Sequence, residues 1–423
     1  MSRKMHNFLA WVIWLLSASF MFYKYAIEVS PSVMTTHLMS EFHIDGAQLG
    51  NLAACYFYAY LLMQIPAGLL VDRFGPRRVT SIAIAICGLG TILFASSGNL
   101  FLAQAGRFAA GLGGAFAALN CLKLTANWFP ANRFALMAGL MMSLGMLGAV
   151  GGQAPLSAFI NTLGWRPALF AIGIAGLALA FLFWLIVRDR SKYHINVNLT
   201  PKDTNLWASC MAVFKSKQSW ILSIYSGLAF APITVFGGLW GVPFISEAFE
   251  LSKMQAANIV SLLFIGFAVG APIWGWFSDF IGTRKKVMYV GTFFAVIAFC
   301  LVLYLPLSVW LLSITMFLFG FFISTFLLCF TMIREINAPM VAATAIGFMN
   351  AFDALLGALS DPLTGKFLDI GWSGKMLEGA RVFSVETYRW ALTTVPIYLV
   401  VATVLLFFIK ETYCKSAYPT SMP

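Results

Sequence analysis

Twelve long apolar segments, separated by short polar connections, run through almost the whole sequence. A helix needs roughly 20 apolar residues to cross a bilayer, and lipid offers the backbone no partner, so a spanning segment must close its own hydrogen bonds. The segments lie near residues 8–30, 47–70, 79–97, 100–124, 134–158, 166–187, 219–241, 254–277, 286–305, 308–332, 341–364 and 389–410. The sequence therefore predicts an all-α membrane protein with twelve transmembrane helices.

The basic residues between these segments predict the orientation of the chain. Hydrophobic residues make up 60% of the sequence and charged residues only 10%, yet the net charge is +11. Most Lys and Arg residues fall in alternate connections, among them Arg3, Arg73, Arg133, Arg188 and Arg284. Connections rich in Lys and Arg face the cytoplasm. Both termini are therefore predicted to be cytoplasmic, and the topology explains the positive charge without a nucleic-acid partner.

The longest polar stretch divides the chain into two halves. We expect an N-terminal six-helix bundle over residues 1–187, a cytoplasmic linker over 188–218, and a C-terminal six-helix bundle with a short tail over 219–423. The seven cysteines stand singly, and the four histidines fall in tails or connections without metal-ligand spacing. The sequence therefore predicts no metal site, no cofactor and no enzymatic activity.

A motif rich in glycine and arginine follows the second predicted span and returns after the eighth, at the matching place in each half. Its glycines permit a tight turn and close helix approach, and its aspartate can face the positive end of a neighbouring helix. Matched positions indicate that the halves are parallel repeats. The motif residues are Gly68, Asp72, Arg73, Gly75, Arg77 and Arg78 in the first copy, and Gly275, Asp279, Gly282 and Arg284 in the second.

This double motif resembles the signature of the major facilitator superfamily, which the first copy matches in full. In the second copy, Phe280 stands where the signature prefers a base. Gly106-Arg107 and the glycines after it resemble the fourth-helix pattern of that family, and Gly164-Trp165-Arg166 resembles its short turn before helix six. The resemblance implies two six-helix bundles that rock about a central site, with the duplicated loops as a cytoplasmic gate.

Two finer patterns bear on the branch of the family. Helix five carries glycines similar to those of the family's antiporters, but Gly148 stands at the place of their proline, which disfavours a drug/proton antiporter. In the N-terminal half, Tyr23-Lys24-Tyr25 and Gly113-Gly114 resemble the branch that contains the lysosomal dipeptide transporter. Ala115 and Met146 replace an acidic and a basic residue of that branch, which counts against a peptide substrate.

Few ionisable residues are predicted inside the membrane, where each costs at least roughly 2.5 kcal/mol unless it faces a cavity or a partner. Lys24 and Glu28 share a face of helix one because they are spaced i, i+4, and Arg107 is predicted at similar depth in helix four. One interpretation is a charged cluster in which Lys24 or Arg107 attracts an anionic group of the substrate. The alternative is that Lys24 and Glu28 reach to the outer surface while Arg107 is structural.

Asp353 lies near the middle of helix eleven, where loss of solvent favours the neutral acid. We interpret Asp353 as a proton site, and the alternative is a buried carboxylate that is satisfied by its neighbours. Further polar aromatic and amide side chains predict a binding cavity, with helix packing as the alternative. These are Tyr25, Tyr56, Tyr60, Asn120, Tyr225 and Trp240.

Together these features predict a secondary active transporter that moves a small polar or anionic organic solute, such as an amino acid, a short peptide or a carboxylate. The predicted mechanism is alternating access in symport with protons. Proton-driven export of an amphipathic compound is the alternative. We expect a monomer in a bacterial inner membrane, whose partners are the substrate, protons and the lipid bilayer.

Overall fold

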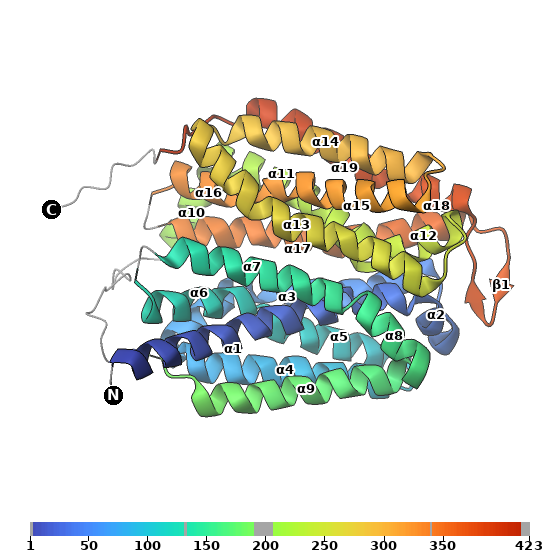
Figure 1. Cartoon of the computed structure of the whole chain (residues 1–423), viewed down its shortest axis with the longest axis horizontal. Coiled ribbons are helices and arrows are strands. Elements are labelled where there is room, and N and C mark those ends of the chain that lie inside the picture. Colours follow the sequence, from blue (N-terminus) through green and yellow to red (C-terminus); the bar gives the residue numbers. More distant parts are fainter. Residues whose placement is uncertain (1–2, 131–132, 190–205, 339–340, 416–423) are drawn as a thin grey trace.

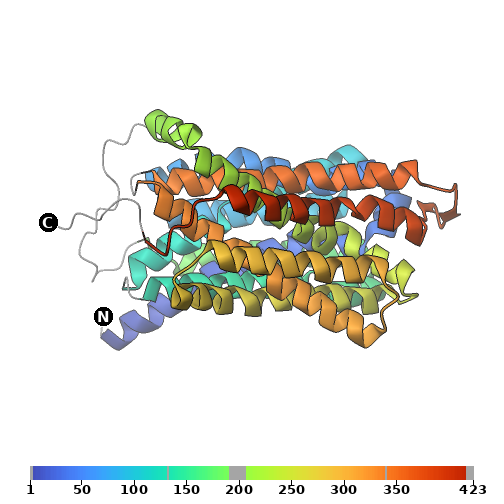
Figure 2. The same ribbon diagram turned by 90° about the horizontal axis from the view of Figure 1, so that it is seen from above.

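The computed structural model describes residues 3–130, 133–189, 206–338 and 341–415, with the backbone alone at 3–7, 65, 72, 135 and 206–210. Helices make up nearly all of this chain and run mostly along one common axis (Figures 1 and 2). The only strands in the described ranges are β1 (Met376–Leu377) and β2 (Ala380–Arg381), which pair as an antiparallel hairpin. The predicted all-α class is confirmed.

The elements of the first half gather in the lower part of Figure 1, and most of those of the second half lie above them. The first half contains α1 (Arg3–Val29), η1 (Ser30–Val33), α2 (Thr35–Phe42), α3 (Gly46–Phe74), α4 (Pro76–Ser96), α5 (Leu100–Gly114), α6 (Ala117–Trp128), α7 (Phe134–Gly151), α8 (Ala154–Leu163) and α9 (Trp165–Ile186). The second contains α10 (Leu206–Lys215), α11 (Lys217–Pro232), η3 (Ile233–Trp240), α12 (Gly241–Ala248), α13 (Lys253–Ile281), α14 (Lys285–Tyr304), α15 (Val309–Ile323), η4 (Ser324–Leu327), α16 (Leu328–Ile336), α17 (Ala342–Ile370), α18 (Val385–Leu392) and α19 (Thr394–Phe408).

Within the described residues, eleven helical segments are long and apolar enough to cross a membrane. They follow eleven of the predicted spans in order, from Phe8–Val33 to Val385–Phe408. The predicted span at 47–70 corresponds to α3, a helix of 29 residues that is not among the eleven. Large apolar side chains such as Phe101, Phe181 and Phe407 are exposed on the outer surface, as a lipid-facing surface requires. The chain is a multi-pass integral membrane protein.

Several spans are built from two helices that meet at a glycine or a proline. α5 ends at Gly114, where an added Cβ would collide with the Tyr56 hydroxyl, so this glycine allows α3 and α5 to approach closely. After Pro232, α11 continues into η3, a π-helix of 8 residues. A π-helix turns the following side chains relative to an α-helical register and is frequent at functional sites.

The bundle has two distinguishable ends. α1 begins and α19 ends at the left in Figure 1, and we name this the terminus end. The β1–β2 hairpin and α2 lie at the opposite end, which we name the hairpin end.

Helices α3 and α17, which belong to different halves, pack closely against each other at the hairpin end. An added Cβ at Gly50 would overlap the backbone of Asp361, and Gly46 and Gly365 each face the other's carbonyl oxygen. Toward the terminus end, Gly68 on α3 and Gly347 on α17 have open space, because no described atom outside their own helix turns lies within 4 Å of an added Cβ. The seam between the halves is therefore closed at the hairpin end.

Candidate functional site

A cavity of about 290 Å³ lies between the two halves. α1, α3, α5, α6 and α7 line it from the first half, and α11, η3, α13, η4, α16 and α17 line it from the second. Its polar lining residues are Lys24, Tyr25, Glu28, Tyr60, Asn350 and Asp353. Five of these six were predicted as site residues from the sequence, and the cavity brings them together from three helices.

The Lys24 and Glu28 side chains form a buried ion pair along α1. The Lys24 ammonium lies 3.7 Å from the centroid of the Tyr25 ring and 5.2 Å from that of Tyr60. Cation–π contacts of this kind stabilise a desolvated ammonium beyond its ion pair. An ammonium has three donors, so Lys24 is placed to bind an anionic group as well as Glu28.

Arg107 lies beside this pair but faces a second, much smaller cavity. Its side chain is 1% exposed and donates from Nη1 to the Ile27 carbonyl at 2.9 Å and from Nη2 to the Glu28 carbonyl at 3.3 Å. The guanidinium lies over the Tyr56 ring, 5.1 Å from its centroid. Arg107 and Asp361 line a void of about 10 Å³. Arg107 thus holds α5 against α1 rather than entering the main cavity.

Asp353 brings a carboxylate from the second half to the main cavity. It is 7% exposed, and its Oδ1 accepts a hydrogen bond from the Ser226 hydroxyl at 2.6 Å. Asn350, one helical turn earlier on α17, lines the same wall. The two halves together therefore place one ammonium and two carboxyl groups in the described lining of the main cavity.

Four further predicted residues do not belong to the described lining of the main cavity. Tyr56 stacks on Tyr60 with ring centroids 6.5 Å apart, and Asn120 donates to the Phe116 carbonyl at 2.9 Å. Tyr225 shares a hydrogen bond with Thr292 at 2.9 Å, and the Trp240 indole donates to the carbonyl of Asp361 at 3.3 Å. All four are buried among neighbouring helices and support the walls.

The remaining lining is apolar, and its methionine and phenylalanine side chains were not predicted from the sequence. The spacing of Met142 and Met146 indicates that they share one face of α7. An apolar face of a spanning helix can contact lipid as well as line a cavity, so this spacing did not identify the cavity. The apolar lining includes Met21, Met141, Met142, Met146, Phe57, Phe230, Phe267, Phe326 and Phe330.

The first copy of the glycine and arginine motif lies at the terminus end and contacts the end of α9. Arg77 donates through Nε and Nη2 to the Trp184 carbonyl at 2.9 and 2.7 Å, and its backbone N–H donates to Asp189 at 2.6 Å. Gly75 has φ of 83°, so a side chain there would be strained. Arg73 and Arg78 are exposed, and the Asp72 side chain lies outside the described residues.

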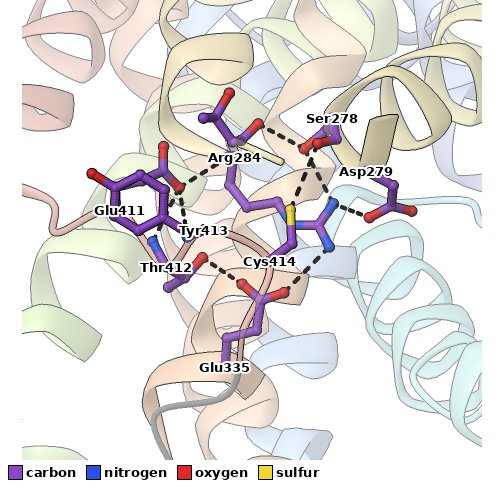
Figure 3. Close-up of polar contacts among 9 residues, drawn as sticks. Ser278, Asp279, Arg284, Glu335, Glu411, Thr412, Tyr413 and Cys414 are labelled. Carbon is purple, nitrogen blue, oxygen red and sulfur yellow. Dashed lines mark hydrogen bonds and ion pairs between the residues drawn. The ribbon is translucent and has the colours of Figure 1, made fainter. Parts of the chain in front are cut away.

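The second copy forms a denser cluster, shown in Figure 3. Arg284 pairs with Asp279 at 2.6 Å and with Glu335 on α16 at 3.2 Å. Gly282, with φ of 69°, makes the turn between them. Burial alone lowers the pKa of Arg284, but the charges of Glu335 and Asp279 outweigh it and raise the pKa above its ordinary value. This guanidinium is therefore always charged and joins α13 to α16.

The segment after α19 completes this cluster. Glu411 accepts from the backbone N–H groups of Arg284 at 3.0 Å and Lys285 at 2.9 Å, and so caps the first turn of α14 (Figure 3). A carboxylate at a helix N-terminus satisfies free N–H groups and faces the positive end of the helix dipole.

Replacing Glu411 by Ala should therefore lower the stability of the second half by about 1–2 kcal/mol. We expect the apparent melting temperature of the purified protein to fall by about 2–4 °C. The control is Glu247→Ala, which removes an exposed carboxylate of α12 and should leave the melting temperature unchanged. Equal melting temperatures for the two variants would contradict the capping role.

At the hairpin end, Asp369 closes the seam between the halves. Its carboxylate, at the end of α17, accepts from the backbone N–H groups of Gly46 at 2.8 Å and Ala47 at 2.7 Å, which begin α3. Arg381 of β2 pairs with the same carboxylate at 2.9 Å. One half thus caps a helix of the other half.

Replacing Asp369 by Ala should open the hairpin end more often. The measurement is the rate at which a thiol reagent modifies a cysteine placed at Thr234, which lines the small cavity. Asp45→Ala is the matched control, because Asp45 caps the same helix from within its own half. Both variants should lose about 1 kcal/mol of stability, but only Asp369→Ala should speed modification. Similar rates in both variants would rule out the seal.

The fold and the cavity define a class: a polytopic α-helical membrane protein with a buried, charged cavity between two halves, as in secondary transporters. The family model described as Major Facilitator Superfamily matches residues 13–243 and again residues 222–420. The chain belongs to the Major Facilitator Superfamily.

Relatives with assigned names support this membership. The chain is 35% identical to the uncharacterized transporter YybO of Bacillus subtilis, over 41% of this chain and 40% of that protein. It is 26% identical to the lysosomal dipeptide transporter MFSD1 of Danio rerio, over 81% of this chain and 77% of that protein. This second similarity extends well beyond the N-terminal half in which the sequence resemblance was found. The chain is also 22% identical to the probable galactarate/D-glucarate transporter GudP of Escherichia coli, over 64% of this chain and 66% of that protein.

Solved structures share the fold. A bacterial homolog of the human lysosomal transporter Spinster, in an inward-facing and unoccupied conformation, superposes with a TM-score of 0.81 at 17% identity and full coverage of both chains. A mutant of the nucleoside transporter NupG superposes with a TM-score of 0.74 at 16% identity, over 94% of this chain and 99% of that chain.

Proposed function

We propose that this protein is a proton-coupled symporter that moves a small polar or anionic organic solute by alternating access. The observation that carries the proposal is the cavity between the halves, which holds Lys24, Glu28 and Asp353 together, while α3 and α17 are in close contact at the hairpin end. Lys24 binds the anionic group of the solute, and Asp353 accepts and releases the proton. The relatives named as dipeptide and sugar-acid transporters support a substrate of this size and charge.

The proposed architecture has twelve spans in two six-helix bundles, over residues 1–187 and 219–423, joined by a cytoplasmic linker over 188–218. α3 is the twelfth span, because its 29 residues match the other long helices in length and it runs beside α17. Residues 190–205 of the linker lie outside the described residues. The terminus end is proposed to face the cytoplasm of a bacterial inner membrane, with the protein acting as a monomer and without cofactor or metal.

With this orientation we propose that the described conformation faces inward, because α3 and α17 close the seam between the halves at the hairpin end. Moving outward would require the contacts of Asp369 and the glycine seam to break and the loops with Arg77 and Arg284 to close on each other. Substrate and proton must favour this rearrangement by binding one conformation more tightly than the other.

The test is reconstitution of the purified protein in liposomes with an imposed proton gradient, followed by uptake of labelled amino acids, dipeptides and carboxylates. We expect accumulation of at least one solute class against its gradient when the exterior of right-side-out vesicles is acidic. Solute accumulation that is the same with and without the proton gradient would contradict proton coupling. Gradient-driven movement in the opposite direction would instead establish the alternative, an exporter.

A further inference from the structure

The two walls of the main cavity differ sharply in chemistry. All of its polar side chains come from α1, α3 and α17. Every lining residue contributed by α6, α7, α11, η3, α13, η4 and α16 is apolar. The cavity therefore has one charged wall and one wall that offers no side-chain hydrogen bond.

The charged wall has places for only a few polar groups of a ligand. Asp353 already accepts from Ser226, and Lys24 already pairs with Glu28. Lys24 keeps donors for one further anion, and Asn350 and Tyr60 can bind groups beside it. A carboxylate is the head group that this wall suits.

The apolar wall determines which chemical groups the rest of the ligand can have. Its side chains include Met141, Met142 and Met146 of α7 and Phe267 of α13. A hydroxyl pressed against them loses its water and gains no partner, which weakens binding by roughly tenfold or more for each hydroxyl. Methionine adapts to irregular apolar shapes, so this wall accepts aliphatic and aromatic bodies alike.

We propose that the substrate is an amphipathic carboxylate, with its charged head at Lys24 and an aliphatic or aromatic body against the methionine and phenylalanine wall. The inference rests on the proposed function and narrows its substrate class. It separates this chain from the relative named as a galactarate/D-glucarate transporter, whose named substrates are polyhydroxylated acids.

The test measures binding to the full-length purified protein with two matched pairs of probes. Hexanoate and gluconate share chain length and carboxylate but differ in hydroxyl groups. The dipeptides Leu-Leu and Asn-Asn share a zwitterionic head and have side chains of similar shape. We expect the apolar member of at least one pair to bind about 100-fold more tightly, from thermal stabilisation measured against ligand concentration. The pair that binds identifies the head group. Equal or tighter binding of gluconate and Asn-Asn, or no binding by any probe, would overturn the inference.

A wall variant sharpens the test. Met146→Gln places an amide on the apolar wall at nearly constant volume and should reduce the preference within the binding pair about tenfold. Met254→Gln is the matched control, because Met254 is 43% exposed on α13 and outside the cavity lining. The same loss of preference in both variants would show that the apolar wall does not determine the preference for the apolar ligand.

The outcomes separate this inference from the proposed function. Proton-driven uptake of gluconate without binding of hexanoate or Leu-Leu would support proton-coupled symport and contradict the inference that the substrate is amphipathic. Tight binding of hexanoate or Leu-Leu without any gradient-driven uptake would support an amphipathic ligand for the cavity and contradict proton-coupled symport.

Discussion

Replacing Lys24 by Met should abolish uptake, with a rate at least about 100-fold below that of the unmodified protein. Among the described residues that line the main cavity, Lys24 is the one cation, so the variant removes the group proposed to bind the anionic head. It also leaves the Glu28 carboxylate buried without its partner, which costs about 3–5 kcal/mol. The measurements are uptake at matched expression and the melting temperature.

The double variant Lys24→Met with Glu28→Gln separates the two effects. Neutralising both partners removes the unpaired charge, so stability should return to near that of the unmodified protein. Uptake should stay absent, because no ammonium remains in the cavity. Full uptake in either variant would show that Lys24 does not bind the substrate.

Replacing Asp353 by Asn should eliminate proton-driven accumulation while exchange of labelled for unlabelled substrate continues. The amide still accepts from Ser226 and fits the same space, but it cannot take up and release a proton. The measurement compares accumulation under an imposed proton gradient with counterflow in vesicles without a gradient. We expect accumulation to fall to the equilibrium level, with counterflow changed by no more than about threefold.

Asp45→Asn is the matched control for this substitution. Asp45 caps α3 at the hairpin end, and Asn is an equally good capping residue, so accumulation should persist. Unchanged coupling in Asp353→Asn would place the proton site on another residue.

The positions of the spans could be predicted from the sequence because hydrophobic length is a local property. The Lys24–Glu28 pair was equally local, since spacing along one helix brings the two side chains together. Arg107 was placed at the correct depth, but its guanidinium bonds to backbone carbonyls rather than to the Glu28 carboxylate. Which group a buried arginine contacts depends on the rotation of its helix, which an almost uniformly apolar span leaves undetermined.

Contacts between distant segments were beyond prediction from the sequence. Asp369 caps a helix more than 300 residues earlier in the chain, with Asp369 and Gly46 separated by 323 positions. Trp240 was expected in the cavity, but it is the last residue of the π-helix η3, which turns its side chains away from the α-helical register. The apolar wall of the cavity could not be predicted, because methionines that face a cavity and methionines that face lipid form the same sequence pattern.

The direct backbone contact between α3 and α17 has an energetic consequence for the host cell. A seam made of Gly46, Gly50 and Gly365 leaves little room for a file of water molecules, along which protons would otherwise hop unaccompanied. Each elementary charge that slips across a membrane potential of 100 mV dissipates about 2.3 kcal/mol. Glycine at these positions thus limits proton leak across the membrane. A bulkier residue would separate the two helices, admit water and allow protons to cross without substrate.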